Sequence, residues 1–265
     1  MNLLHKLTHE WQKPWILLWF LCGVIALFAG YAAETGQPYA QALTSLLTFA
    51  GSEERFALIK LGVAILGLLC VVALAFRKNV AGNGLGIAAN IGEIFVQGRS
   101  GATGLMLSPV FYLATHLYGL YYWGKNQDGD GNMIPRGANS LIWGLTIVFI
   151  LVGLILFPWL NDALAAYRFI DNDSSQAINL FGLSVSWYSI NVLAFVLGVS
   201  AQTAMILRYA FSWWLWIIVN FVWLIVNLMN GNLIFAIQTI IYQINAIIAL
   251  YEWWENSRRN DNAHG

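Results

Sequence analysis

Apolar and polar residues follow one another along the chain in long blocks. Eight apolar blocks can be distinguished, and polar stretches separate them. A helix needs about 20 residues to cross the hydrocarbon core of a bilayer, with about 17 as the usual lower limit. The third and seventh blocks fall just below this limit, but removing either one would fuse or strand its neighbours. The blocks are Pro14–Tyr31, Phe56–Phe76, Gly82–Val96, Leu105–Trp123, Leu141–Trp159, Leu183–Leu207, Trp213–Leu228 and Leu233–Tyr251.

Backbone hydrogen bonding determines the structure of these blocks. In lipid each backbone N–H and C=O needs a partner inside the protein, so helices are the economical choice. We therefore predict an all-α polytopic membrane protein with eight spans. The first block also has features of a signal peptide, but its apolar stretch is long and rich in Trp, which favours a retained helix.

The composition supports lipid as the solvent of this chain. Of its 265 residues, 59% are hydrophobic and only 10% are charged, whereas soluble proteins carry about 25% charged residues. The formal net charge is +0, so no basic surface indicates binding to nucleic acid. Cys22 and Cys70 both lie in apolar runs, and we interpret them as small buried hydrophobic residues rather than a disulfide or a metal pair.

The basic residues indicate the orientation, because Lys and Arg concentrate in cytoplasmic loops. With the N-terminus inside, four of the 13 basic residues lie outside, namely Arg55, Lys60, Arg99 and Arg168, and the other nine lie inside. We therefore predict that both termini are cytoplasmic.

A shift of 130 positions reveals an internal repeat, in which residues 81–126 lie over 211–256 without a gap. Ten pairs are identical, among them Asn90/Asn220 and Gly101/Gly231, and Lys78 aligns with Arg208. The offset covers an even number of spans, so the two copies are parallel, an arrangement known from transporters. The predicted units are 1–54 (an extra N-terminal helix), 55–126 (first three-helix repeat), 127–181 (linker helix and loops), 182–256 (second repeat) and 257–265 (tail).

The loop between the first repeat and the linker contains Asp128-Gly-Asp-Gly-Asn, which resembles part of a calcium-binding EF-hand loop. The downstream acidic ligand of such a loop is missing, so we interpret the segment as a solvated turn.

Polar side chains in the middle of a span are costly and by default face a cavity or the bundle interior. The two short spans carry such stripes at helical spacing. The matching spans add further polar positions on shared faces. The second copy contributes Trp213, Trp216, Asn220, Trp223 and Asn227, the first contributes Asn90, Glu93 and Gln97, and neighbouring spans contribute Ser108, Tyr112, Tyr188, Asn191, Gln202, Gln238, Tyr242 and Asn245.

Other roles remain open for some of these residues. Trp213, Trp123 and Trp253 lie near span ends, where Trp commonly forms an interfacial belt, and we assign Trp123 to that belt. Asn side chains in spans also join helices through hydrogen bonds. Glu93 could accept hydrogen bonds from ligand hydroxyls, carry a proton, or extend towards an interface.

Enzymatic chemistry finds little support in the sequence. The chain contains no zinc-protease, nucleophile-elbow or Walker A motif, and three of its four His residues lie in terminal tails. Glu93 with His116 is the best starting point for a membrane enzyme or a receptor, but we interpret His116 as a packed histidine. No metal or cofactor is predicted.

Several segments resemble the PnuC family of nicotinamide riboside transporters over roughly residues 55–256. The resemblance is carried by Ser212-Trp-Trp-Leu-Trp-Ile-Ile-Val-Asn220, by the turn Asn230-Gly-Asn232, and by the endings Tyr251-Glu-Trp253 and Tyr118-Gly-Leu-Tyr-Tyr-Trp123. The first helix and the loop Asp128–Arg136 look like additions to the family pattern.

The resemblance implies a fold of three, one and three helices, related to SWEET sugar transporters, in the bacterial inner membrane. It also implies facilitated diffusion of nicotinamide riboside, with phosphorylation by a cytoplasmic kinase trapping the product, and it is compatible with a homotrimer. The motif assigns Trp213, Trp216 and Asn220 as substrate contacts. Gly82, Gly84 and Gly86 replace the more aromatic character of this span in typical members.

The chemistry of the polar stripes agrees with such a substrate. A cationic ring over an indole gains about 0.5–2 kcal/mol, and Asn or Gln can pair with both the donor and the acceptor of a carboxamide. The spans contain no central Lys or Arg, which fits a substrate without phosphate. A carrier for thiamine, riboflavin or a sugar is the alternative, because Trp and Asn suit any flat polar ring.

Overall fold

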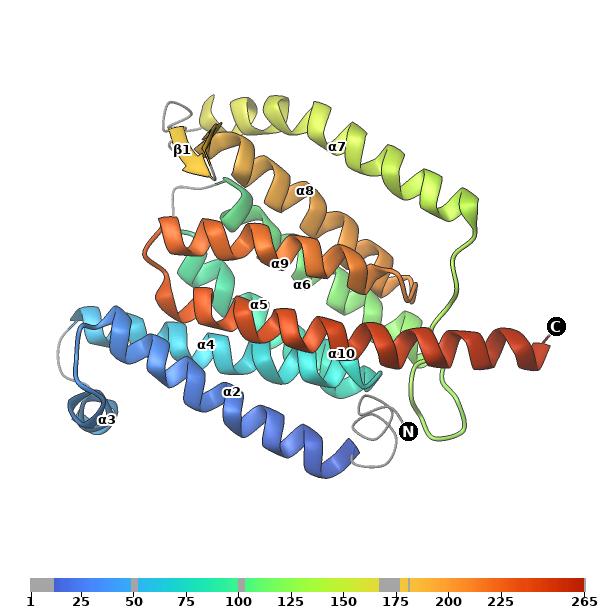
Figure 1. The fold of residues 1–265 in the computed structure, drawn as a ribbon, viewed down its shortest axis with the longest axis horizontal. Coiled ribbons are helices and arrows are strands. Elements are labelled where there is room, and N and C mark those ends of the chain that lie inside the picture. Colours follow the sequence, from blue (N-terminus) through green and yellow to red (C-terminus); the bar gives the residue numbers. More distant parts are fainter. Residues whose placement is uncertain (1–11, 49–51, 100–102, 167–176, 181, 265) are drawn as a thin grey trace.

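The chain forms a bundle of helices that run back and forth between two ends (Figure 1). The computed structural model describes residues 12–48, 52–99, 103–166, 177–180 and 182–264. The elements in these parts are α2 (Gln12–Glu34), α3 (Tyr39–Thr48), α4 (Ser52–Ala75), α5 (Asn79–Gln97), α6 (Thr103–Gly124), α7 (Ser140–Ala166), β1 (Ala177–Leu180), β2 (Leu183–Ser186), α8 (Trp187–Ile206), α9 (Ser212–Met229) and α10 (Leu233–His264).

Six helices in the described ranges are long and apolar enough to cross a membrane: α2, α4, α7, α8, α9 and α10. The remaining long helices, α5 and α6, carry polar residues such as Asn83, Glu93 and His116 along their length. These side chains lower the mean hydropathy of the two helices. The prediction of a helical membrane protein is therefore confirmed. Length and composition identify six candidate spans in the described ranges and do not confirm the predicted count of eight.

The short helix α3 and the two strands β1 and β2 were not predicted. The short helix α3 follows α2, and β1 pairs with β2 in an antiparallel hairpin whose turn contains Gly182 at φ +85°. The sixth span was expected to begin at Leu183, but those residues form β2. Helix α8 begins only at Trp187, because the side chain of Ser186 caps it by accepting a hydrogen bond from the Ser189 N–H at 3.1 Å. Two residues used in the sequence predictions, Gly101 and Arg168, lie outside the described residues.

The end of the bundle where α2 begins and α10 terminates is crossed by residues 126–137, which we call the strap. The Met133 N–H donates to the Arg77 carbonyl at 2.9 Å, after α4, and the Arg136 N–H donates to the Arg208 carbonyl at 2.7 Å, after α8. The strap thereby joins the turns after α4 and α8. Arg77 and Arg208 also share a left-handed backbone, with φ of 61° and 71°. By backbone conformation, Arg208 is therefore equivalent to Arg77, whereas the sequence alignment matched it with Lys78.

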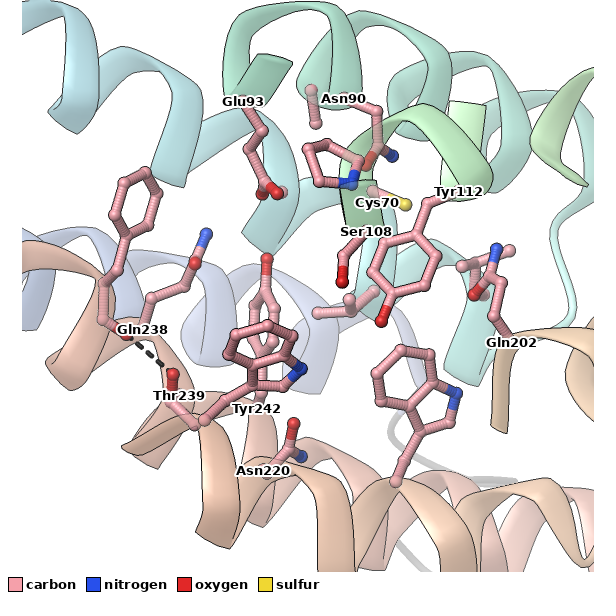
Figure 2. A pocket seen from close by; sticks show the side chains of 18 of the residues that line it. Cys70, Asn90, Glu93, Ser108, Tyr112, Gln202, Asn220, Gln238, Thr239 and Tyr242 are labelled. Atoms are coloured by element: carbon pink, nitrogen blue, oxygen red, sulfur yellow. Dashed lines mark hydrogen bonds between the residues drawn. The ribbon is translucent and has the colours of Figure 1, made fainter. Parts of the chain in front are cut away.

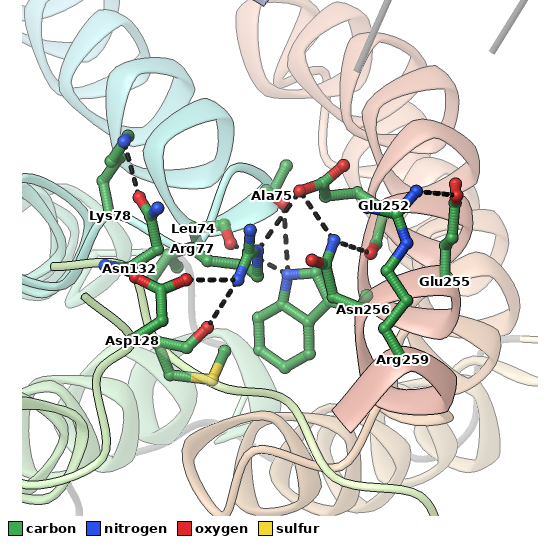
Figure 3. Close-up of polar contacts among 12 residues, drawn as sticks. Leu74, Ala75, Arg77, Lys78, Asp128, Asn132, Glu252, Glu255, Asn256 and Arg259 are labelled. Carbon is green, nitrogen blue, oxygen red and sulfur yellow. Dashed lines mark hydrogen bonds and ion pairs between the residues drawn. The ribbon is translucent and has the colours of Figure 1, made fainter. Parts of the chain in front are cut away.

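Arg77 holds the strap from the side as well (Figure 3). Its guanidinium contacts Asp128 at 3.3 Å, the Met133 carbonyl at 3.1 Å and Glu252 of α10 at 3.2 Å. The Asp128 carboxylate also accepts the N–H groups of Asp130 and Asn132, as in a tight turn. The predicted turn is present, but it is fixed by Arg77 instead of projecting freely into solvent.

Two tryptophans cross-connect the helices next to the strap. The indole N–H of Trp123, at the end of α6, donates to the Ile206 carbonyl at 2.9 Å, and that of Trp253 donates to the Leu74 and Ala75 carbonyls at 3.1 Å each. Both side chains are fully buried, with ring centroids 5.5 Å apart. The assignment of Trp123 to an interfacial belt is wrong, because its N–H satisfies a carbonyl at the end of α8 that no later helical turn reaches.

Helix α2 is attached at the opposite end, which carries the hairpin and which we call the hairpin end. The Lys60 ammonium contacts Glu34 at 2.7 Å and the Asn232 side-chain oxygen at 2.8 Å. The second carboxylate oxygen of Glu34 accepts the Ile234 N–H at 3.1 Å, in the first turn of α10. This buried ion pair joins α2 to α4 and α10, with each charged group hydrogen-bonded, as burial requires.

The crossed indoles generate a stability prediction. In Trp253→Phe the Leu74 and Ala75 carbonyls lose a shared donor, which should lower the free energy of unfolding by about 1–3 kcal/mol. Thermal unfolding of the detergent-purified variant measures this loss. Trp254→Phe is the matched control, since the neighbouring Trp254 is 49% exposed. Equal effects of the two substitutions would contradict the role assigned to Trp253.

Candidate functional site

A cavity lies in the middle of the bundle, with walls from α4, α5, α6, α8, α9 and α10. Helices α2 and α7 contribute none of its lining residues among the described parts of the chain. Eight of the ten predicted site residues line it. They are Asn90, Glu93, Gln202, Trp213, Trp216, Asn220, Gln238 and Tyr242.

The predicted stripe on α9 faces the cavity along its whole length. Trp213, Trp216, Asn220, Trp223 and Asn227 all line it, as their spacing of three and four residues requires. The ring of Trp216 meets the ring of Tyr112 from α6 edge to face, with centroids 5.8 Å apart. Helix α9 thus supplies an aromatic wall interrupted by amides.

Several polar atoms of residues that line the cavity are buried without a hydrogen-bond partner among the described residues. They include the indole N–H groups of Trp213 and Trp216 and the side-chain oxygens of Asn227 and Asn245. Buried polar atoms in proteins are nearly always paired, so each unpaired one needs an explanation. Donors and acceptors that converge on one cavity are suited to binding a polar ligand there.

The predicted polar face of α5 supplies the opposite wall. Asn90, Glu93 and Gln97 line the cavity, and Ser108 and Tyr112 of α6 join them (Figure 2). The Asn90 N–H₂ group donates to the Gly86 carbonyl of its own helix at 2.7 Å, which fixes the side chain and leaves its oxygen for other contacts.

Two tyrosines approach the cavity over glycines. A Cβ atom on Gly67 of α4 would lie 2.3 Å from the Tyr242 hydroxyl oxygen, and one on Gly198 of α8 would lie 2.3 Å from that of Tyr112. Only glycine leaves room for these hydroxyls. Gly67 also makes room for Gln238, whose N–H₂ group donates to the Ala64 carbonyl at 3.0 Å.

Gln202 and His116 are linked by a chain of hydrogen bonds. The Gln202 N–H₂ group contacts the Thr115 hydroxyl at 3.0 Å and the His116 ring at 3.4 Å, and the other ring nitrogen of His116 contacts Asn83 at 3.0 Å. Asn83 in turn donates to Asn79 at 2.9 Å. Both ring nitrogens of His116 are therefore engaged, as expected for a packed histidine.

Tyr188 and Asn191 do not line the cavity. The ring of Tyr188 packs near that of Phe157 on α7, with centroids 6.5 Å apart, and Asn191 donates to the Trp187 carbonyl at 3.1 Å. Both lie in the first turns of α8, about four and three turns from Gln202 and towards the hairpin end. They lie on the same helix as Gln202 but closer to the hairpin end than the cavity does.

The sequence predictions missed the contribution of α4. Gly67, Cys70, Val71 and Leu74 line the cavity from one face of this helix. Their spacing is helical, but only Cys70 is even weakly polar. Polarity therefore did not distinguish these residues from the other apolar residues of the span. Cys70 is buried, as predicted, whereas the prediction of a buried Cys22 is wrong, because this residue is exposed on α2.

The cavity carries little charge. Glu93 is the single charged residue among those lining it, and no Lys or Arg is present in that set. Within the described residues no group of three or more His, Cys, Asp and Glu lies together as a metal site requires.

The sequence and the fold are similar to those of known membrane transporters. The sequence profile described as "Nicotinamide mononucleotide transporter" matches residues 57–255. The chain is 26% identical over 201 residues to "Nicotinamide riboside transporter PnuC" of Haemophilus influenzae, covering 74% of this chain and 79% of that protein. It is 24% identical over 208 residues to the protein of the same name from Escherichia coli K12, covering 73% and 84%.

A solved structure described as "Crystal structure of the Vitamin B3 transporter PnuC" has a similar fold, with a TM-score of 0.67, 17% identity and 92% of each chain covered. The profile match extends over most of the chain, from α4 to α10, and includes every helix that lines the cavity. The chain therefore belongs to the PnuC family of membrane transporters.

Proposed function

We propose that this protein carries nicotinamide riboside across the bacterial inner membrane. The observation that carries this proposal is the central cavity, where unpaired indole N–H groups and amide oxygens surround a space without Lys or Arg. The names of the Haemophilus influenzae and Escherichia coli relatives support the same substrate.

The lining residues suit each part of this molecule. An aromatic wall containing Trp216 can stack on the flat cationic ring. Asn220 offers both a donor and an acceptor to the carboxamide, and Gln238 and Tyr242 can pair with the ribose hydroxyls. A phosphate would find no basic partner among the lining residues, which disfavours a nucleotide.

The transport mechanism we infer is facilitated diffusion. A carrier of this kind needs selective binding and alternating exposure, and phosphorylation of the product by a cytoplasmic kinase keeps the internal concentration low. A carrier for thiamine, riboflavin or a sugar is the alternative, and direct binding of these solutes distinguishes the two.

For the architecture we propose eight spans with two parallel three-helix repeats, α4–α6 and α8–α10, joined by α7 and preceded by α2. Reciprocal contacts support this arrangement. Trp123 and Trp253 lie 130 positions apart, and each donates to the end of the first helix in the other unit. Tyr112 and Tyr242, also 130 apart, each approach a glycine there. The units 1–54, 55–126, 127–181, 182–256 and 257–265 remain the proposed division, and a homotrimer remains a prediction.

Substitutions on α9 test the site. Trp216→Ala removes the aromatic platform and should weaken binding of nicotinamide riboside by about 1–3 kcal/mol, or roughly 5- to 150-fold. Asn220→Leu keeps the volume but leaves the carboxamide unpaired, so a loss of similar size is expected. Isothermal calorimetry on each monodisperse variant measures both effects. Trp214→Ala is the matched control, because Trp214 lies on the same helix and is 48% exposed.

Two results would contradict the proposal in different ways. If Trp216→Ala and Asn220→Leu stay folded and bind as tightly as the parent, the site lies elsewhere. If the parent binds thiamine, riboflavin or glucose but not nicotinamide riboside, the cavity serves another solute.

Orientation is tested by reporter fusions. We predict cytoplasmic termini, because nine of the 13 basic residues lie on the inner side of the eight-span arrangement. A phosphatase that is active only in the periplasm should be inactive when fused after Gly265 and active when inserted into the turn at Gly231. Activity after Gly265 would overturn the eight-span arrangement.

A further inference from the structure

The charge in the cavity is unbalanced. Glu93 forms no hydrogen bond or ion pair with any described residue, although Asn90 and Gln97 lie on the same face of α5. In Figure 2 its carboxylate points into the space that Tyr242 approaches from the other side. An acidic group in this position faces the cavity.

Lys60 of α4 and Arg99, which follows α5, are engaged outside the cavity. Lys60 is bound to Glu34 and Asn232 at the hairpin end. The guanidinium of Arg99 lies over the rings of Phe56 and Phe95, 5.0 and 5.2 Å from their centroids. Neither residue lines the cavity.

Helix α5 adds to the negative potential. It ends at Gln97, so Glu93 lies one turn before the C-terminus, where the unpaired carbonyls of a helix carry partial negative charge. A carboxylate inside a helix bundle loses part of its hydration, and without a counter-charge that loss is unfavourable. A cation bound beside it would offset the cost, and the same cation would be attracted to the faces of the tryptophan rings.

We propose that Glu93 is the counter-charge for the ligand and makes the carrier select monocationic ring compounds over neutral compounds of the same shape. This inference rests on the proposed function and deepens it. Asn220 and Trp216 recognise the carboxamide and the ring plane, which a neutral ring also has. Glu93 recognises the positive charge, and this property separates a pyridinium riboside from a neutral riboside or a sugar.

The test varies the charge of the ligand and of residue 93 together. The ligands are nicotinamide riboside and benzamide riboside, in which a carbon replaces the charged ring nitrogen so that the ring is neutral and similar in size. The parent should bind the cation roughly 10-fold more tightly than the neutral compound, which corresponds to about 1.4 kcal/mol. In Glu93→Gln this preference should fall to about 2-fold or less, because affinity for the cation drops and affinity for the neutral ligand stays or rises.

Two further variants control for charge and for location. Glu93→Asp keeps the carboxylate and should keep most of the preference. Glu255→Gln removes a carboxylate that pairs with Arg259 near the end of α10, outside the cavity, and should leave the preference unchanged. Calorimetric titrations of both ligands into each variant provide the affinities.

The outcomes are distinguishable. Equal weakening of both ligands by Glu93→Gln would overturn the inference, because it would mean that Glu93 accepts hydrogen bonds from the ribose, and the proposed function would stand. A parent that binds both ligands equally would overturn the inference without any variant, even if Glu93→Gln does not fold. A parent that binds neither ligand would instead reject the proposed function.

Discussion

The last carbonyls of α4 and α8 are the constraint on which the bundle depends. A helix leaves these groups without partners, and in a membrane protein they need donors from elsewhere in the chain. Here the backbone of the following turn satisfies most of them. The last carbonyl of each helix accepts from a tryptophan of a distant helix, Ala75 from Trp253 of α10 and Ile206 from Trp123 of α6. Helix α10 is thereby fixed to α4, and α6 to α8, at the end of the bundle that the strap crosses, and these four helices contribute to the walls of the cavity.

Bonds to the backbone of the same helix satisfy many polar side chains of the bundle, but not the indoles on α9. Ser200 lies in a helix that packs on its neighbours, and its hydroxyl donates to the Val196 carbonyl one turn earlier. Such back-bonding satisfies a polar side chain locally. The indoles of Trp213 and Trp216 have no such option, because an indole N–H cannot reach its own backbone. Placing Trp and Asn side by side on α9 therefore keeps binding capacity available in a dry environment.

The additional elements brace the ends of the bundle without entering the site. Helix α2 is joined to α4 and α10 through Glu34 and Lys60, while the strap joins the turns after α4 and α8 through Arg77 and Arg208. Both attachments use charged groups with several partners, and these partners offset the loss of hydration on burial. The cavity is thus enclosed by helices whose ends are fixed at both sides.

The sequence by itself determined the helical membrane class and the polar stripe on α9, because hydropathy and helical periodicity are local properties that neighbouring residues set. It also marked Glu93 as an unusual residue within a span. Only the tertiary structure decided which faces meet. It placed Tyr188 and Asn191 outside the lining of the cavity, placed Trp123 in the core, and revealed Gly67 and Gly198 beneath the two tyrosines. These features depend on how distant helices pack, and no pattern within one helix records the depth or identity of its partner.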